Sequence, residues 1–181
     1  MNKILIVVDM QNDFINGSLG SEAAQAIVPN VVSKIKNFDG DCIILTMDTH
    51  KSNYLETQEG KKLPVKHCIE NTNGWRINTQ VAEALEKGCP VHTLMKSTFG
   101  AKNIADMINS AMQLQNIDEK NLEIELVGLD TDICVISNAL LIKAFFLDAQ
   151  VKIDSSCCAG TSTTAHECAL EVAKSCQIDV I

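Results

Sequence analysis

Six short apolar runs, separated by segments with helical periodicity, limit the fold of this chain more than any other feature. The runs lack the strict alternation of a sheet with one solvated face, so we expect both faces of each strand to be covered, as in a parallel sheet. Strands that alternate with helices predict a three-layer α/β/α fold with a doubly wound, mainly parallel sheet of about six strands. We expect a single domain over residues 1–181. The predicted strands are 3–8, 41–47, 90–95, 123–129, 150–154 and 177–181.

Five helices are expected between these strands. Pro29 suits the first turn of a helix, where a missing backbone N–H costs nothing. Gly88 suits the end of the helix that contains "INTQVAEALEKG". Thr164 and Glu167 have the spacing of a capping box at the start of the last helix. The predicted helices are 29–37, 77–88, 101–116, 132–147 and 164–176.

Composition and charge argue against several classes of protein. Apolar residues make up 46% of the chain and charged residues 21%, as in an ordinary soluble globular protein without a membrane span. A net charge of −8 with scattered lysines and arginines argues against a nucleic-acid partner. Eight cysteines without a recognisable signal sequence indicate a reducing compartment, so we expect a cytoplasmic protein with free thiols. Six are expected to be small buried fillers: Cys42, Cys89, Cys157, Cys158, Cys168 and Cys176.

Reactive side chains follow the predicted strands at the point where each strand ends. Asp9 follows the first strand, Lys96 the third, and Cys134 lies just past the fourth. Ligands of parallel α/β sheets bind outside the carboxyl ends of the strands, so these three side chains are expected to meet in one pocket. Taken singly, each has an ordinary structural explanation: a helix cap, a solvated lysine and a buried filler.

The chemistry of this trio can be argued from charge. A free cysteine has a pKa of about 8.5, and the helix terminus next to Cys134 lowers it by about one unit at most. A cation is therefore needed, and Lys96 is the obvious one. Asp9 could accept the thiol proton and pass it to a leaving group. Backbone N–H groups of the turn 130–134 could hold the oxyanion of an acyl-transfer intermediate.

A second constellation surrounds the long polar segment 49–75. Segments of this length inside a compact domain are usually functional or disordered. Asp48 and His50 are two residues apart on an extended chain, and His67 returns from the loop. A carboxylate with two imidazoles suits Zn²⁺, with Fe²⁺ or Mn²⁺ as alternatives, and Glu59 is a possible fourth ligand. The Asp-x-His pattern by itself is a weak signal.

Four segments together resemble the isochorismatase-like cysteine hydrolase superfamily, and within it the nicotinamidase-like branch. They occur in the family's order and span residues 4–140, so the joint match is far more specific than any one segment. The segments are "VVDMQNDFINGSLG" with the first aspartate, "DTH…LPVKHC" with the metal ligands, "MKSTFGA" with the lysine and "VGLDTDICV" with the cysteine.

The resemblance implies a role for each matched residue. Cys134 would be the nucleophile, Lys96 its cationic partner and Asp9 the general acid and base. The bond between Leu129 and Asp130 would be a cis peptide next to the oxyanion site. The implied metal ligands are Asp48, His50 and His67, with Glu59 near the position of an additional ligand. Members of the family often assemble as dimers or tetramers, so we expect a homo-oligomer.

The substrate pocket departs from the family pattern. Position 130 is Asp where many nicotinamidases have Ala, and the lysine segment lacks their longer tyrosine-bearing stretch. Only 4% of the residues are aromatic, which leaves few rings for a stacking pocket. We expect Phe14, Phe99 and Trp75 to contact the substrate.

The resemblance and the cysteine together predict a cysteine amidohydrolase. It would cleave the C–N bond of a small amide through a thioester, and nicotinamide is the leading substrate. Ureido or carbamoyl amides are the alternative substrates. A non-catalytic metal-binding protein on the same fold is the alternative outside the enzymes. A phosphoacceptor domain is less consistent with the sequence, because it would give Cys134 no function.

Overall fold

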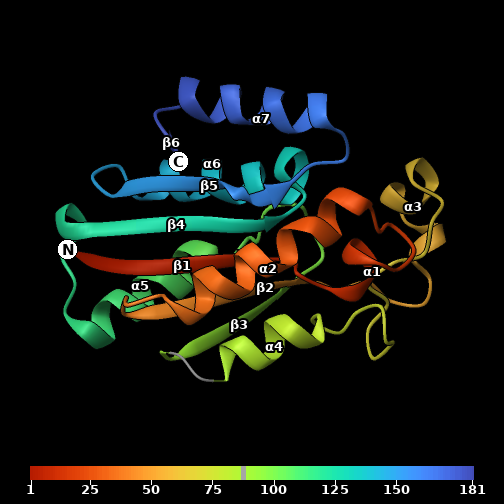
Figure 1. Cartoon of the computed structure of the whole chain (residues 1–181), viewed down its shortest axis with the longest axis horizontal. Coiled ribbons are helices and arrows are strands. Elements are labelled where there is room, and N and C mark those ends of the chain that lie inside the picture. Colours follow the sequence, from red (N-terminus) through yellow and green to blue (C-terminus); the bar gives the residue numbers. More distant parts are fainter. Residues whose placement is uncertain (87–88) are drawn as a thin grey trace.

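The computed structural model describes residues 1–86 and 89–181, and these residues form a six-stranded sheet (Figure 1). The strand order is β3-β2-β1-β4-β5-β6, and every neighbouring pair is parallel. The prediction of a doubly wound parallel sheet is therefore confirmed. The strands are β1 (Asn2–Val8), β2 (Cys42–Asp48), β3 (Val91–Lys96), β4 (Leu122–Leu129), β5 (Gln150–Ala159) and β6 (Asp179–Val180).

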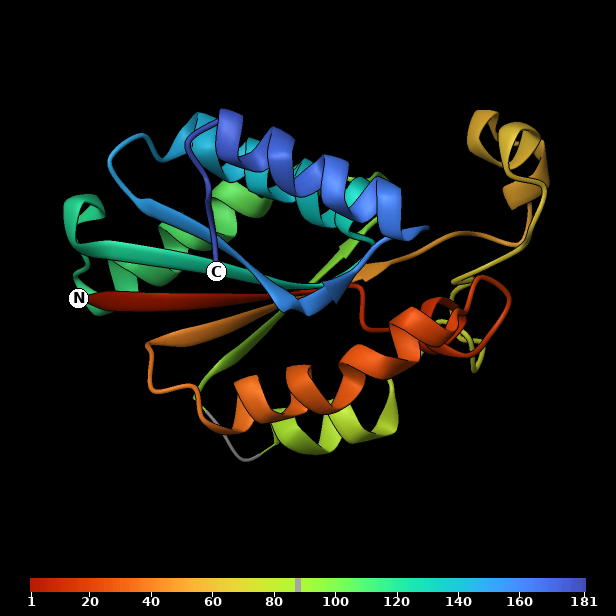
Figure 2. The ribbon, with the colours of Figure 1, turned by 45° about the horizontal axis from the view of Figure 1, so that its top comes forward.

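Helices cover both faces of the sheet (Figure 2). One face carries α2 (Glu22–Lys36) and α4 (Thr79–Leu85), and the other carries α5 (Ile104–Gln115), α6 (Ile136–Phe145) and α7 (Thr163–Ser175). Side chains of β1 alternate between the two hydrophobic cores, and all from Ile4 to Val8 are buried. Burial on both faces explains why the strand reads as a continuous apolar run. None of the described helices has the length and apolar character needed to span a membrane.

The start of α2 differs from the prediction. The helix begins at Glu22, and Pro29 lies inside it. Ser21 caps the helix, because its side chain accepts a hydrogen bond from the backbone N–H of Ala24 at 3.0 Å. Proline has no backbone N–H, so Pro29 cannot donate the usual helix hydrogen bond to the carbonyl of Gln25. Both residues are exposed, so water can donate to that carbonyl instead.

The predicted capping box of the last helix is also wrong. Ser162 is the cap of α7 and accepts a hydrogen bond from the N–H of Ala165 at 3.1 Å, so Thr164 already lies within the helix. The helix was placed correctly and its first turn was not. The predicted C-cap at Gly88 lies outside the described residues, and α4 ends at Leu85.

All eight cysteines are free, but three of the six expected fillers are not buried. Cys168 and Cys176 are exposed, and Cys89 is half-buried. Both exposed residues belong to the solvent side of α7 and its end, where the helix needs no apolar side chain. The prediction of buried fillers holds for the remaining three, Cys42, Cys157 and Cys158.

The polar segment 49–75 is ordered and lies beyond the carboxyl ends of the strands (Figures 1 and 2). It contains a 3₁₀ turn (Tyr54–Glu56) and the short helix α3 (Gln58–Lys62), whose cap Thr57 accepts from the N–H of Gly60. The N–H of His50 donates to the carbonyl of Cys68 at 2.9 Å, which ties the end of the segment to the end of β2. Helix α1 (Asn12–Ile15) lies at the same end of the sheet.

Candidate functional site

Asp9 is the first residue after β1 and its side chain is fully buried. Its φ of 49° lies in the left-handed region, which aspartate tolerates better than most residues. The Thr46 hydroxyl donates a hydrogen bond of 2.7 Å to Asp9 Oδ1, and the Asp9 N–H donates to the Thr46 carbonyl at 3.2 Å. One carboxylate oxygen is thus fixed by β2, and the other remains available to a further partner.

Lys96 supplies that partner from the end of β3. Its Nζ lies 2.6 Å from Asp9 Oδ2 and 3.7 Å from Asp48 Oδ1. The register of the sheet pairs Asp48 with Lys96 on adjacent strands, and the lysine side chain reaches from the edge strand β3 past Asp48 to Asp9. Only 2% of the Lys96 side chain is exposed, so the ion pair is shielded from water.

Cys134 reaches the same point from β4. Gly128 has φ of 120°, and a Cβ there would clash with the carbonyl oxygen of Val8, so glycine lets β4 approach β1 beside the site. The peptide bond between Leu129 and Asp130 is cis, as the resemblance implies. A π-helical turn (Thr131–Val135) then leads into α6 and places Cys134 Sγ 3.4 Å from Lys96 Nζ.

The electrostatics of the three side chains follow from burial. Burial and the nearby Asp9 raise the pKa of the Cys134 thiol well above its ordinary value, and Lys96 only partly opposes them. Burial also raises the pKa of Asp9 against the opposing effect of Lys96. Burial works to lower the pKa of Lys96, but Asp9, Cys134 and Asp48 outweigh it and raise that pKa. Burial therefore disfavours the charged forms of both the Cys134 thiol and the Asp9 carboxyl, and the Lys96 ammonium between them favours those forms.

Asp48, His50 and His67 form a compact cluster with metal-binding chemistry. Their ligand atoms all lie within 4.8 Å of one another, and all three side chains are buried. Asp48 Oδ2 lies 2.9 Å from His50 Nε2 and 3.5 Å from His67 Nε2. Glu59 is slightly farther, with Oε1 at 3.6 Å from His50 Nε2 and 3.8 Å from His67 Nε2.

Two details show that this cluster fits a divalent cation. His67 Nδ1 is 2.8 Å from the carbonyl of Val65, so that nitrogen carries the hydrogen and Nε2 presents a lone pair to the cluster. In the described part of the chain, the buried His50 Nε2 has no properly directed hydrogen bond despite its short contact with Asp48. A buried imidazole nitrogen without a partner beside a carboxylate is the arrangement expected of a metal ligand.

The sequence interpretation missed two side chains that position the cluster. Gln11 Nε2 donates to the carbonyl of Asp48 at 2.8 Å, and the N–H of Asp48 donates back to Gln11 Oε1 at 2.7 Å. Asp13 Oδ2 accepts a hydrogen bond of 2.7 Å from the N–H of Cys68, next to His67. The available signal was that both belong to the same "DMQND" segment as the first aspartate.

A cavity of about 390 Å³ opens above Cys134. Phe14 and Phe99 line it, as do Asp48, Glu59, His67 and Asp130. The structure therefore brings two of the three expected aromatic rings to the cavity. It does not bring the third.

The third ring belongs to Trp75, which is not part of the described lining. Its indole N–H donates instead to the Thr49 hydroxyl at 2.9 Å. Its backbone carbonyl accepts a hydrogen bond of 2.8 Å from Gln11 Nε2. Trp75 therefore stabilises the loop around Asp48, His50 and His67.

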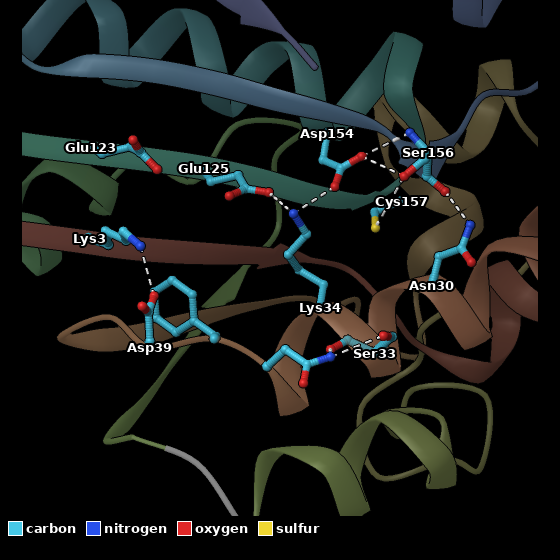
Figure 3. Close-up of a pocket in the computed structure, with 12 residues that line it drawn as sticks. Lys3, Asn30, Ser33, Lys34, Asp39, Glu123, Glu125, Asp154, Ser156 and Cys157 are labelled. Atoms are coloured by element: carbon cyan, nitrogen blue, oxygen red, sulfur yellow. Dashed lines mark hydrogen bonds and ion pairs between the residues drawn. The ribbon is translucent and has the colours of Figure 1, made fainter.

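A second cavity, of about 430 Å³, lies between α2 and the strands β4 and β5 (Figure 3). Lys34 Nζ is 2.6 Å from Glu125 and 2.8 Å from Asp154, and Ser156 donates to Asp154 through its hydroxyl at 2.7 Å. Burial, with the added effect of Asp154, raises the pKa of the Cys157 thiol to about 11. Its lysine and carboxylates are paired with one another and burial disfavours its thiolate, so we interpret this cavity as a polar contact between layers.

Comparison with known proteins points to one family. A family model described as isochorismatase domain matches residues 3–181. The nicotinamidase of Schizosaccharomyces pombe is 26% identical over 98% of this chain and 91% of its own length. The crystal structure of the nicotinamidase/pyrazinamidase PncA from Bacillus subtilis has a TM-score of 0.83, with 28% identity and 99% of both chains covered. The pyrazinamidase of Pyrococcus horikoshii, solved in complex with zinc, shares the fold at 23% identity, with a TM-score of 0.78 over 100% of this chain and 99% of that one.

Proposed function

This chain belongs to the isochorismatase family, and from that premise we propose that it is a cysteine amidohydrolase of small amides. It is a hydrolase that acts on C–N bonds other than peptide bonds, as the family and its nicotinamidase relatives indicate. Nicotinamide is the leading substrate, with nicotinic acid and ammonia as products, because proteins named nicotinamidase match nearly the whole chain.

One observation carries the proposed triad. The Lys96 ammonium contacts both other members, at 2.6 Å from Asp9 and 3.4 Å from Cys134 Sγ. The sulfur attacks the carbonyl carbon of the amide while its proton passes to Asp9, and Lys96 stabilises the negative charge that develops on sulfur. Asp9 then gives the proton to the amide nitrogen, the C–N bond breaks, and ammonia leaves behind a thioester.

The second half of the reaction uses the same groups in reverse. Asp9 takes a proton from a water molecule as the water oxygen attacks the thioester carbon. The C–S bond breaks, the acid product leaves, and the proton returns to the Cys134 sulfur. Both tetrahedral intermediates carry an oxyanion, which we assign to the backbone N–H groups of Asp130 and Cys134. Both residues line the cavity, which supports this assignment.

A divalent cation would be held by Asp48, His50 and His67, with Glu59 as an additional ligand. Zn²⁺ is the leading candidate because the donor set mixes imidazole and carboxylate, and Fe²⁺ or Mn²⁺ are the alternatives. When bound, the ion would supply a Lewis acid that anchors a heteroatom of the substrate. The side chains of Phe14 and Phe99 would hold the apolar part of the substrate on the cavity wall.

Ammonia release from a panel of amides tests the proposal. The panel contains nicotinamide, pyrazinamide and N-carbamoyl amino acids, assayed with the wild type, Cys134→Ala and the control Cys176→Ala. We expect release from nicotinamide, loss of at least about a thousandfold in Cys134→Ala, and wild-type rates in the control, whose thiol is exposed and remote from the triad in sequence. Full activity in Cys134→Ala would refute the nucleophile.

Two other outcomes would change the proposal in different ways. If ammonia is released from the carbamoyl compounds alone, nicotinamide is the wrong substrate and the proposed triad stands. No release from any amide, together with a Cys134 thiol that iodoacetamide alkylates no faster than Cys176 at any pH, would favour the non-catalytic metal-binding protein.

We also propose a cytoplasmic protein that assembles as a dimer or tetramer. The eight free cysteines support a reducing compartment. The resemblance to the family supports the assembly. Light scattering of the purified chain checks the assembly, and a monomer at micromolar concentration would contradict it.

A further inference from the structure

Asp130 places a carboxyl group on the wall of the cavity that also contains Cys134. It follows the last residue of β4 and lines the cavity with Cys134 and His67. Its backbone carbonyl is engaged, because the N–H groups of Ile133 and Val135 both donate to it at 3.1 Å. Its side chain caps no helix, and within residues 1–86 and 89–181 it takes part in no hydrogen bond or ion pair.

Two neighbouring carboxyl groups, those of Asp132 and Asp9, are engaged, in contrast to that of Asp130. Asp132 accepts hydrogen bonds from the N–H and the hydroxyl of Thr161, at 2.8 Å and 2.6 Å. Asp9 is paired with the Lys96 ammonium, which is therefore not available as a partner for Asp130. A half-buried carboxyl group without a partner beside a nucleophile is a group that a ligand can satisfy.

The charge around Asp130 indicates which kind of ligand fits. Its negative neighbours are Asp132, which Thr161 holds, and Asp9, which Lys96 holds, so no cation in the described residues is paired with Asp130. A substrate with its own carboxylate would add to the repulsion among these carboxyl groups. A substrate with a protonated amine would relieve it and supply the missing hydrogen-bond donor.

We propose that Asp130 is a specificity-determining residue, whose carboxylate binds a protonated amine on the amide substrate at a distance from the scissile bond. The proposal rests on the amide hydrolysis proposed above and predicts that amides with an ammonium group are better substrates than nicotinamide, whose ring nitrogen is not protonated at neutral pH. A hydrogen bond to a charged group favours such a substrate by about 10- to 100-fold over a neutral one of the same shape.

Three amides of equal size test this proposal. Piperidine-3-carboxamide and piperidine-4-carboxamide carry an ammonium in the ring, and cyclohexanecarboxamide has the same ring without it. The measured quantity is the ratio of kcat/KM between each piperidine amide and cyclohexanecarboxamide, with the zinc-loaded enzyme. We expect a ratio of about 10 or more for at least one piperidine amide, and a fall of that ratio towards one in Asp130→Asn.

A control variant separates direct contact from a general charge effect. Asp132→Asn removes the same charge two residues away, where the carboxyl is held by Thr161. We expect this variant to keep most of the ratio. An equal fall in both variants, or a wild-type ratio near one, would overturn the proposal.

Binding to Cys134→Ala distinguishes this proposal from the proposed function. Calorimetry gives the affinity of the same amides when no turnover occurs. If the wild type hydrolyses none of them but Asp130→Asn in the Cys134→Ala background loses the preference for the ammonium, the proposed hydrolysis fails and the role of Asp130 stands. If the amides are hydrolysed without any such preference, the role of Asp130 fails and the hydrolysis stands.

Discussion

The Lys96 ammonium lies 2.6 Å from the Asp9 carboxylate, and both side chains are almost completely buried. If either residue were removed, water could not take its place beside the remaining charge, so we expect the two residues to stabilise the fold only as a pair. Burying charged groups costs free energy. Here the buried pair lies next to a cysteine, whose sulfur is 3.4 Å from the ammonium. A thiol and a carboxyl group are thus held in contact with one buried ammonium.

Removal of one partner should destabilise the protein more than removal of both. Lys96→Met leaves a buried carboxylate alone and should cost about 3–5 kcal/mol in the free energy of unfolding, and Asp9→Asn should also destabilise. The double variant should recover part of this loss. Urea denaturation of the four proteins measures the coupling, and strictly additive losses would show that the pair does not act as a unit.

Removal of the metal should weaken substrate binding more than folding. Chelation, or His67→Ala, takes away the ion that we propose as the anchor of the substrate, so KM should rise and Zn²⁺ should restore the chelated enzyme. His92→Ala, on β3 at some distance in sequence from the cluster, serves as the matched control and should change neither quantity. An unchanged KM in metal-free protein would count against an anchoring metal.

Gln11→Ala should lower the affinity for the metal, although Gln11 is not a ligand. Its amide group holds both backbone polar groups of Asp48, at 2.8 Å and 2.7 Å. Loss of such a supporting residue lowers metal affinity by about 10- to 100-fold. Competition with a chromophoric chelator measures the affinity, and Asn12→Ala, whose side chain bonds only the Asn73 carbonyl in the described residues, is the control. Equal affinities in the two variants would refute the positioning role.

Asp130→Asn should stabilise the protein above pH 7. The pKa of Asp130 is raised from 3.8 to about 7 in the folded chain, so the folded state resists ionisation and loses stability as the pH rises through this window. The variant lacks this penalty and should gain about 1–2 kcal/mol at pH 8, after allowance for solvent screening, and nothing at pH 4. Thermal unfolding across this range checks the sign. A variant less stable than the wild type at pH 8 would contradict it.

Local periodicity and the order of residues were enough to predict the layers of the fold. Strands such as β1 are buried on both faces, and that burial appears in the sequence as an unbroken apolar run. Helix starts were harder to predict. Pro29 and Thr164 had the right chemistry for a first turn, but Ser21 and Ser162 made the hydrogen bonds that cap the helices. The choice between nearby capping residues depends on backbone angles that tertiary packing decides.

The sequence by itself determined which chemical groups stand at the strand ends, because the alternation of strands and helices brings all carboxyl ends to one edge of the sheet. It therefore indicated that Asp9, Lys96 and Cys134 could meet. Only the tertiary structure decided the distances between them, the support of Asp48 by Gln11 and the isolation of the Asp130 carboxyl. These features depend on strand register and on loops that pack across long sequence separations, and no local pattern of residues encodes such contacts.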